Sequence, residues 1–280
     1  MRIALATCES LADLFPSDKL LADCLRATGH EVAPWVWTRP RPDSLDGIVI
    51  RTTWDYWHRA DAFRSWLESL RDVPVLNSVD TLLWNLDKRY LHELAEAGVT
   101  IPRTEFHSDR FELGPTMDRM DLERVVIKPA ISAGGDDTFV VERPAAAAEQ
   151  HEIDRLTDRG ILMVQEFLPE IADGELSLVY LGGEYSHTVR KRAAAGEFRI
   201  HVEHGGTVES DSPDQRLIEA ADRVVASLPE VPAYARVDGV VRNDTLVLME
   251  LELIEPELFF DYSEGSAQRF AAVIETRLAD

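Results

Sequence analysis

Lysine is scarce in this chain of 280 residues: only Lys19, Lys88, Lys128 and Lys191 stand among its 29 basic residues. Basic residues as a whole are also few compared with the 51 acidic residues, and the formal net charge is -22. Such an excess of negative charge repels nucleic-acid phosphates and anionic lipid surfaces. We therefore expect neither a nucleic-acid partner nor a membrane partner.

Cysteine and long apolar runs are scarce as well. Cys8 and Cys24 are the only cysteines, and their spacing is not that of a metal site. The apolar run in "MRIALATCES" is too short for a signal peptide, and no stretch approaches the length of a membrane span. We expect a protein of the reducing cytoplasm, with both thiols buried and inert.

The glycine motifs that commonly hold nucleotides are missing. The first apolar run is followed by "ATCESL", which lacks the G-x-G-x-x-G pattern of dinucleotide-binding folds, and no P-loop lysine motif occurs. Any bound nucleotide must therefore be held by another kind of site.

Strand-like apolar runs alternate with amphipathic, helix-like stretches, which predicts an α/β fold of two or three subdomains. In residues 1–84 we expect a small open sheet with a helix that stops at Gly29. Its strands would be "RIALAT", "EVAPWVW", "IVIR" and "VPVLN". Ligands of such a sheet bind beyond the carboxyl ends of its strands.

From residue 85 to 280 we expect a second domain. It would contain a helix over 86–98, a strand, loop and strand over 124–141, a helix over 146–158 and a buried strand in 160–170. Two hairpins should follow, with turns at Gly182-Gly183 and Ala195-Gly196.

Lys128 stands at the end of the apolar run "RVVI" and before "PAISAGGDD". Gly134 and Gly135 free the backbone to approach a ligand, and a lysine beside free N–H groups suits phosphate. An ordinary hairpin with a glycine turn is the alternative.

An acidic strand, "LMELELIEPEL" at 248–258, places Glu250 and Glu252 on one face if the side chains alternate. Asp238 from "VDG" is a candidate third carboxylate. Their mutual repulsion calls for a cation, either arginines in a structural network or Mg²⁺, which binds a few carboxylates together with substrate phosphates.

The order of these segments resembles the ATP-grasp superfamily, above all the branch of prokaryotic glutathione synthetase and the RimK-type ligases. The resemblance covers about residues 75 to 260 and rests on "NLDKRYLHELAEAGVTIPRT", "VVIKPAISAGGDDT", "MVQEFLPEIADGELSLVYLGGEYSH", "VDG" and "LMELELIEP". It implies an ATP-grasp fold with a small N-terminal domain, a mobile lid over about 103–164 and a C-terminal mixed sheet.

The resemblance also implies roles for individual residues. Lys88 and Lys128 would contact the ATP phosphates under the loop from Ser132 to Asp136, which holds Gly134 and Gly135. Glu175 would bind the ribose. Asp238, Glu250 and Glu252 would hold two Mg²⁺ ions, with Mn²⁺ as a substitute, although the family often has Asn at the position of Glu252. The nucleotide base would lie among Gln165, Glu166, Phe167, Leu168 and Met249.

The implied chemistry is the ADP-forming activation of a carboxylate as an acylphosphate, which an amine or another nitrogen nucleophile then displaces. Arg192 and Arg199 stand where the family places arginines near the transferred phosphoryl group. For Arg190 and His201 a solvated strand face is the expected setting.

The substrate is expected to be small and amino-acid-like. Arg51 and Trp54 in "RTTWDYW" offer a guanidinium for its carboxylate, with core packing as the alternative for the aromatic rings. An ammonium group would suit the acidic end at Glu255, Glu257 and Ser263. Ring closure within one molecule, as in D-cycloserine biosynthesis, stays open beside dipeptide or amide formation.

Two functions outside this class also stay open: a phosphotransferase that uses the same ATP site, and a non-catalytic nucleotide or metal sensor. Related ligases are often dimers, so a homodimer is an expected assembly.

Overall fold

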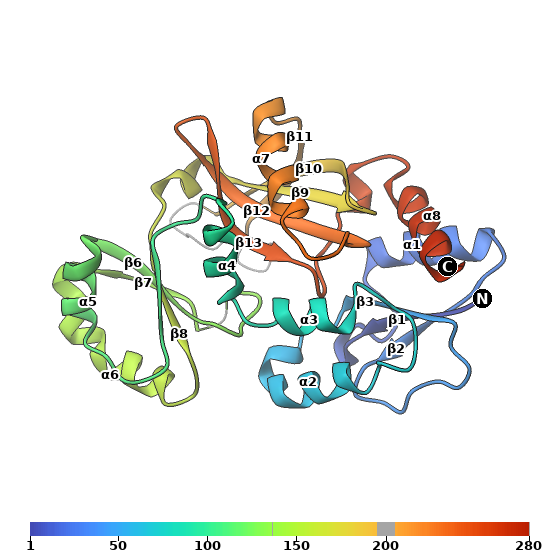
Figure 1. Cartoon of the computed structure of the whole chain (residues 1–280), viewed down its shortest axis with the longest axis horizontal. Coiled ribbons are helices and arrows are strands. Elements are labelled where there is room, and N and C mark those ends of the chain that lie inside the picture. Colours follow the sequence, from blue (N-terminus) through green and yellow to red (C-terminus); the bar gives the residue numbers. More distant parts are fainter. Residues whose placement is uncertain (136, 195–204, 280) are drawn as a thin grey trace.

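The computed structural model describes residues 1–135, 137–194 and 205–279 of the chain. Three sheets surround a central region, with helices on their outer faces (Figure 1). The α/β class expected from the sequence is confirmed. No helix in the described ranges is both long and apolar enough to cross a bilayer.

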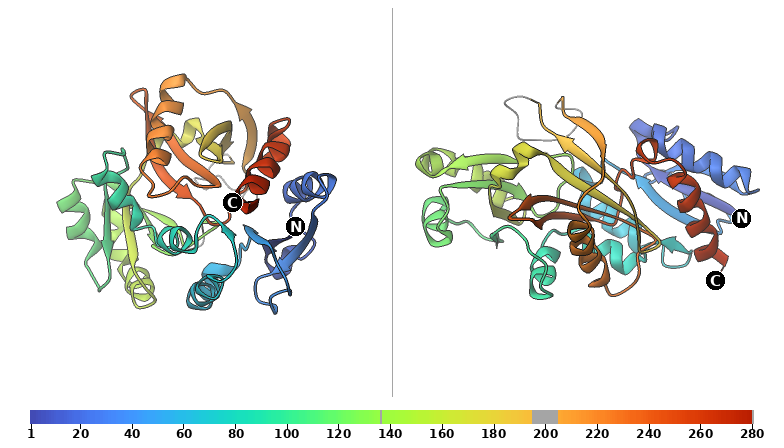
Figure 2. Two further views of the ribbon diagram at one scale, coloured as in Figure 1. Left: turned by 45° about the vertical axis from the view of Figure 1, so that its right-hand side comes forward. Right: turned by 90° about the horizontal axis from the view of Figure 1, so that it is seen from above.

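The first sheet is parallel, has the order β2-β1-β3-β4, and matches the four expected strands. Its strands are β1 (Arg2–Thr7), β2 (Glu31–Val36), β3 (Gly47–Thr52) and β4 (Val75–Leu76). Side chains alternate between its faces: Ile3 and Leu5 pack toward α1 (Pro16–Ala27) and α8 (Ser266–Ala279). Ala4 and Ala6 pack toward α2 (Ala60–Glu68) and α3 (Val79–Asn85). Figure 2 shows α8 beside α1, although the two helices lie at opposite ends of the sequence.

The second sheet is antiparallel, with the order β5-β8-β6-β7. It consists of β5 (Thr104–His107), β6 (Arg124–Pro129), β7 (Phe139–Glu142) and β8 (Leu162–Glu166). Its apolar face packs on α5 (Leu113–Met120) and α6 (Ala146–Thr157). The other face turns toward the centre of the molecule and brings Lys128 and Gln165 there.

The third sheet is antiparallel, with the order β11-β10-β9-β12-β13. It consists of β9 (Glu175–Leu181), β10 (Glu184–Arg192), β11 (Thr207–Asp211), β12 (Tyr234–Arg242) and β13 (Thr245–Glu252). Leucines of β9 and β13 pack on α7 (Gln215–Ala226), so the polar residues between them face inward. The turn at Gly182-Gly183 is confirmed, with φ values of 66° and 84°. The second expected turn, Ala195-Gly196, lies outside the described residues.

The expected helix over 86–98 is shorter in the structure. Helix α4 spans only Tyr90–Glu96, because the amide of Lys88 donates at 2.9 Å to the carbonyl oxygen of Ala130, just after β6, and so leaves the helical path. This connection turns the Lys88 side chain toward the centre.

The simple alternation expected for the acidic strand is also interrupted. A β-bulge shifts the register so that Asp238 pairs with Glu250 while Gly239 pairs with Leu248. The bulge lets Met249 and Glu250 both reach the central cavity. Gly239 is required there, because a Cβ at this position would lie 2.5 Å from the carbonyl oxygen of Val247.

Side chains from earlier parts of the chain hold the backbone at the end of β13. Tyr90 and Asn85 both bond to Leu251, and Asn85 also accepts from the amide of Leu253 (2.9 Å). Asn77 donates to the carbonyl oxygens of Leu253 (2.8 Å) and Tyr234 (2.9 Å). The acidic segment is therefore fixed from outside its own sheet.

Candidate active site

A cavity of about 830 Å³ lies where the three sheets meet. It is lined by the residues after β1 and β3, the connection around Lys88, the inner faces of the second and third sheets, and the segment after β13. Most of the residues predicted from the sequence line this one cavity. They are Trp54, Lys88, Lys128, Ser132, Gly134, Gly135, Gln165, Glu166, Phe167, Leu168, Glu175, Asp238, Met249, Glu250, Glu252, Glu255 and Glu257.

Residues that follow β8 form an apolar end of the cavity. The guanidinium of Arg124 lies 3.7 Å from the centre of the Phe167 ring, and Leu168, Ile171 and Met249 form one apolar cluster. The carboxylate of Glu166 is paired with Arg242 at 2.7 Å. This end of the cavity is therefore apolar, and the residues predicted to surround a nucleotide base lie together there.

Three lysines reach the middle of the cavity, and their environments differ. Lys88 Nζ lies 2.9 Å from Glu250 Oε1 and 2.6 Å from the carbonyl oxygen of Ser132. Lys191 Nζ lies 2.6 Å from Glu175 and 3.4 Å from Asp238. Lys128 forms no ion pair or side-chain hydrogen bond with the described residues, and burial, together with the charge of Lys88, lowers its pKa. An incoming anion can therefore pair with Lys128 without breaking an ion pair between described residues.

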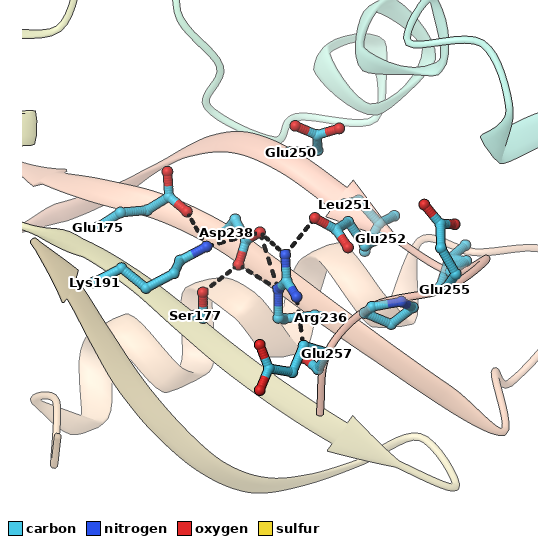
Figure 3. Close-up of polar contacts among 12 residues, drawn as sticks. Glu175, Ser177, Lys191, Arg236, Asp238, Glu250, Leu251, Glu252, Glu255 and Glu257 are labelled. Carbon is cyan, nitrogen blue, oxygen red and sulfur yellow. Dashed lines mark hydrogen bonds and ion pairs between the residues drawn. The ribbon is translucent and has the colours of Figure 1, made fainter. Parts of the chain in front are cut away.

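The carboxylates of the third sheet are joined by Arg236, as Figure 3 shows. Arg236 donates to both oxygens of Asp238, at 3.0 and 2.8 Å, and to Glu252. Burial acts to raise the pKa of Asp238, but Arg236 and Lys191 outweigh it and hold that pKa well below its usual range. At Glu252 the balance is reversed: burial, with Asp238, Glu250 and Glu255 nearby, raises the pKa to about 8.

Glu250 remains the more acidic member of the acidic strand. Burial raises its pKa, yet Lys88 and Lys128 more than offset this and lower it below the ordinary value. Glu175 shows the opposite result, because burial outweighs Lys191 and raises its pKa. The two carboxylates that pair with lysines, Glu250 and Glu175, thus have pKa values shifted in opposite directions.

The described residues contain no group of three acidic, histidine or cysteine side chains placed to hold an ion unaided. Mg²⁺ in nucleotide sites usually takes one or two protein carboxylates and completes its shell with phosphate oxygens and water. Glu250 and Glu252 on one strand supply such a pair of hard oxygen ligands. Asp238 already accepts from Ser177, Arg236 and Lys191, so it must exchange a partner to bind a metal.

Three predicted site residues that the structure describes do not line the cavity. Arg192 contacts the carbonyl oxygen of Asp173 (3.1 Å) and the Glu209 carboxylate (3.0 Å) on the opposite face of β10. Arg51 is fully buried beneath the cavity wall. Ser263 lines a separate groove of about 630 Å³ between α1 and α8. Arg199 lies outside the described residues, as does His201.

The sequence reasoning missed Arg236 and Lys191 as cavity residues. Arg236 stands two positions before Asp238, so strand alternation alone places both on one face. Lys191 stands between Arg190 and Arg192; the pairing of Lys191 with Glu175 turns it inward and the two arginines outward. The available signal was the scarcity of lysine, which singles out Lys191.

Comparisons with known proteins cover both halves of the chain. Residues 93–238 match the model of the prokaryotic glutathione synthetase ATP-grasp domain, and residues 3–77 match that of the N-terminal domain of D-cycloserine synthetase DcsG. The cycloserine biosynthesis protein DcsG of Streptomyces lavendulae is 28% identical over 282 residues, covering 92% of each chain.

Two solved structures have a similar fold. The crystal structure of D-cycloserine synthetase DcsG superposes with a TM-score of 0.89 at 23% identity, covering 99% of this chain and 100% of that one. D-alanine–D-alanine ligase from Bacillus anthracis, complexed with ATP, superposes with a TM-score of 0.71 at 15% identity, covering 100% and 98%.

Proposed function

This chain belongs to the prokaryotic glutathione synthetase family of ATP-grasp ligases, and we propose that it joins the carboxylate of a small amino-acid-like substrate to a nitrogen nucleophile. The observation that carries the proposal is one cavity in which Lys88, Lys128 and Lys191 face the carboxylates Glu250 and Glu252. Triphosphate and Mg²⁺ are the complementary pair of charges for such a site.

The reaction takes place in two steps. A substrate carboxylate oxygen attacks the γ-phosphorus of ATP, ADP leaves, and an acylphosphate forms. The nitrogen then attacks the acyl carbon, the C–O bond to phosphate breaks, phosphate leaves, and the nitrogen gives up a proton. The products are ADP, phosphate and an amide-type bond.

The chain's own residues would orient these groups and neutralise their charge. Lys128 would pair with a phosphate oxygen, while Lys88 and Lys191 would exchange a carboxylate partner for phosphate. Glu250 and Glu252 would hold Mg²⁺, which supplies Lewis-acid stabilisation of the phosphates when bound. Because the charges stand on rigid strands, little reorganisation is needed during the reaction.

The nucleotide would occupy the apolar end of the cavity, with its base beside Phe167 and Met249 and its ribose near Glu175. A volume of about 830 Å³ is within the range of small-molecule sites, so a nucleotide leaves room for a small substrate only. Two ions are the number proposed for the full complex, with Mn²⁺ as a substitute for Mg²⁺. A homodimer and a cytoplasmic location stay predictions.

Ring closure within one molecule is the form of the reaction that we favour. The relative from Streptomyces lavendulae is named for cycloserine biosynthesis, and it matches this chain along almost all of its length. Cycloserine is the cyclic form of O-amino-serine, whose carboxylate and aminooxy nitrogen stand on one molecule. We therefore propose O-amino-D-serine or a close analogue as the substrate.

The test measures ADP, free phosphate and ring product after O-amino-D-serine is mixed with ATP and Mg²⁺. Equal amounts of ADP and phosphate, formed only when the amino acid is present, support a ligase. ADP with a stable phosphorylated product and no free phosphate would identify a phosphotransferase. ATP binding without turnover on this or any other amino acid would identify a sensor.

A further inference from the structure

Glu255 is a buried carboxylate that faces the cavity; it has a hydrogen bond from its own backbone but no side-chain partner among the described residues. Its residue is 8% exposed, and no side chain in the described parts of the chain pairs with its oxygens. In Figure 3 it stands apart from the network around Arg236. Burial is the main reason that its pKa rises to about 7, with Lys88 acting in the opposite direction. A desolvated carboxylate of this kind is costly unless a cation arrives.

Aromatic side chains of the first sheet form the wall beside this carboxylate. Phe15, Trp54, Tyr56 and Trp57 all line the cavity, and the rings of Phe15 and Trp54 lie 5.0 Å apart, edge to face. They follow β1 and β3, at the end of the sheet where ligands are expected. Aromatic faces attract ammonium groups, above all where water is excluded.

Tyr56 is a further aromatic residue that lines the same cavity as Glu255. It is buried, its ring packs at 4.7 Å on Phe63, and its hydroxyl forms no hydrogen bond with another described residue. Burial and then the charge of Glu255 raise the pKa of this phenol. A neutral hydroxyl and a carboxylate thus face the same part of the cavity.

The backbone around Glu255 is fixed from the first sheet. Trp54 Nε1 donates to the carbonyl oxygen of Glu255 at 3.0 Å, and Arg51 donates to that of Pro256 at 2.8 Å. Arg51 is itself held by Asp18, at 2.8 Å, with both side chains buried. Arg51 is therefore a positioning residue for the carboxylate rather than a contact of the substrate.

We propose that Glu255, with Tyr56 and the faces of Trp54 and Trp57, binds the α-ammonium group of the amino-acid substrate. Charge balance supports this subsite, because the described lining residues include eight carboxylates and only four cationic side chains. An ammonium at Glu255 directs the substrate's own carboxylate toward the lysines. The inference deepens the proposed function and rests on it.

The experiment titrates O-amino-D-serine and its Nα-acetyl derivative into the protein loaded with Mg²⁺ and a non-hydrolysable ATP analogue. The wild type should bind the free amine about 10- to 100-fold more tightly than the acetylated compound. Glu255→Gln should lose this preference, and Tyr56→Phe should lose part of it. Glu264→Gln, an exposed carboxylate nearby, should keep it in full.

Melting temperatures and the affinity for the ATP analogue are measured first. Unchanged values show that the variants fold. An equal affinity of the wild type for both compounds, or a preference that persists in Glu255→Gln, overturns the subsite. If the preference depends on Glu255 but no ADP and phosphate form, the ligase proposal fails and the subsite stands. If turnover occurs without the preference, the subsite alone fails.

Discussion

Lys88 Nζ lies 2.9 Å from Glu250 and 2.6 Å from the carbonyl oxygen of Ser132, and it thereby joins the acidic strand to the glycine loop across the cavity. The lysine and the carboxylate neutralise each other in the absence of a ligand. When Mg²⁺ and triphosphate enter, the two charges can separate, each toward the ligand of opposite sign. The pair keeps a site of high charge density stable before it is filled.

Glu250→Gln should therefore have opposite effects with and without metal. With Mg²⁺, the affinity for an ATP analogue should fall about 10- to 100-fold, because an ionised ligand is lost. With EDTA, the affinity should rise, because a negative charge near the phosphates is removed. Calorimetric titration under both conditions measures this, with Glu96→Gln, at an exposed position away from the cavity, as the control. A loss of equal size in EDTA would mean that Glu250 acts only on the structure.

Lys128→Met should weaken ATP binding about 10- to 100-fold while it leaves the fold intact or makes it more stable. The ammonium has no carboxylate partner among the described residues, and burial lowers its pKa, so the charged form is a cost in the ligand-free protein. Urea unfolding and calorimetry measure the two effects. Lys19→Met changes an exposed lysine and should alter neither. Unchanged ATP affinity in Lys128→Met would remove this lysine from the site.

The buried pair of Arg51 and Asp18 should behave as a unit. Arg51→Met alone should destabilise the protein by about 3–5 kcal/mol, because Asp18 is left charged and buried. The double variant with Asp18→Leu should recover much of that loss. A double-mutant cycle by urea unfolding measures the coupling free energy. Additive single effects would show that the pair is not coupled.

His187 should make stability depend on pH. Burial lowers its pKa to about 4, while its ring bonds to the carbonyl oxygen of Leu258 at 3.0 Å. The folded pKa lies below the unfolded value of about 6.5, so stability is complete above pH 6.5 and is lost as the pH falls toward 4, by about 3 kcal/mol.

Unfolding in urea between pH 4 and pH 7 checks this prediction. His187→Gln should show a smaller slope over this range than the wild type, whereas His151→Gln, at an exposed position, should keep the wild-type slope. Equal slopes for the wild type and His187→Gln would assign the pH dependence to other groups.

The sequence predicted the features that follow from the order and periodicity of residues along the chain. It failed for side chains whose position depends on a contact with a residue far away in the sequence. Strand periodicity located Glu250 and Glu252, and the glycine loop located Lys128. The sequence predicts that Arg51 binds a substrate carboxylate, but the side chain is buried and pairs with Asp18, 33 positions away. Strand alternation places Met249 on the face away from Glu250, and only the family resemblance placed it at the cavity. The bulge opposite Gly239, which lets both side chains reach the cavity, has no local sequence pattern.

The end of β13 and the segment after it carry four of the cavity carboxylates, Glu250, Glu252, Glu255 and Glu257, yet their backbone is held by Asn77, Asn85, Tyr90, Arg51 and Trp54. These residues are separated from it by most of the chain. An N-terminal half exchanged with that of a relative would bring different side chains to the same carbonyl oxygens. We therefore expect substrate specificity to depend on both halves of the chain. A chimera that keeps only one of them should lose it.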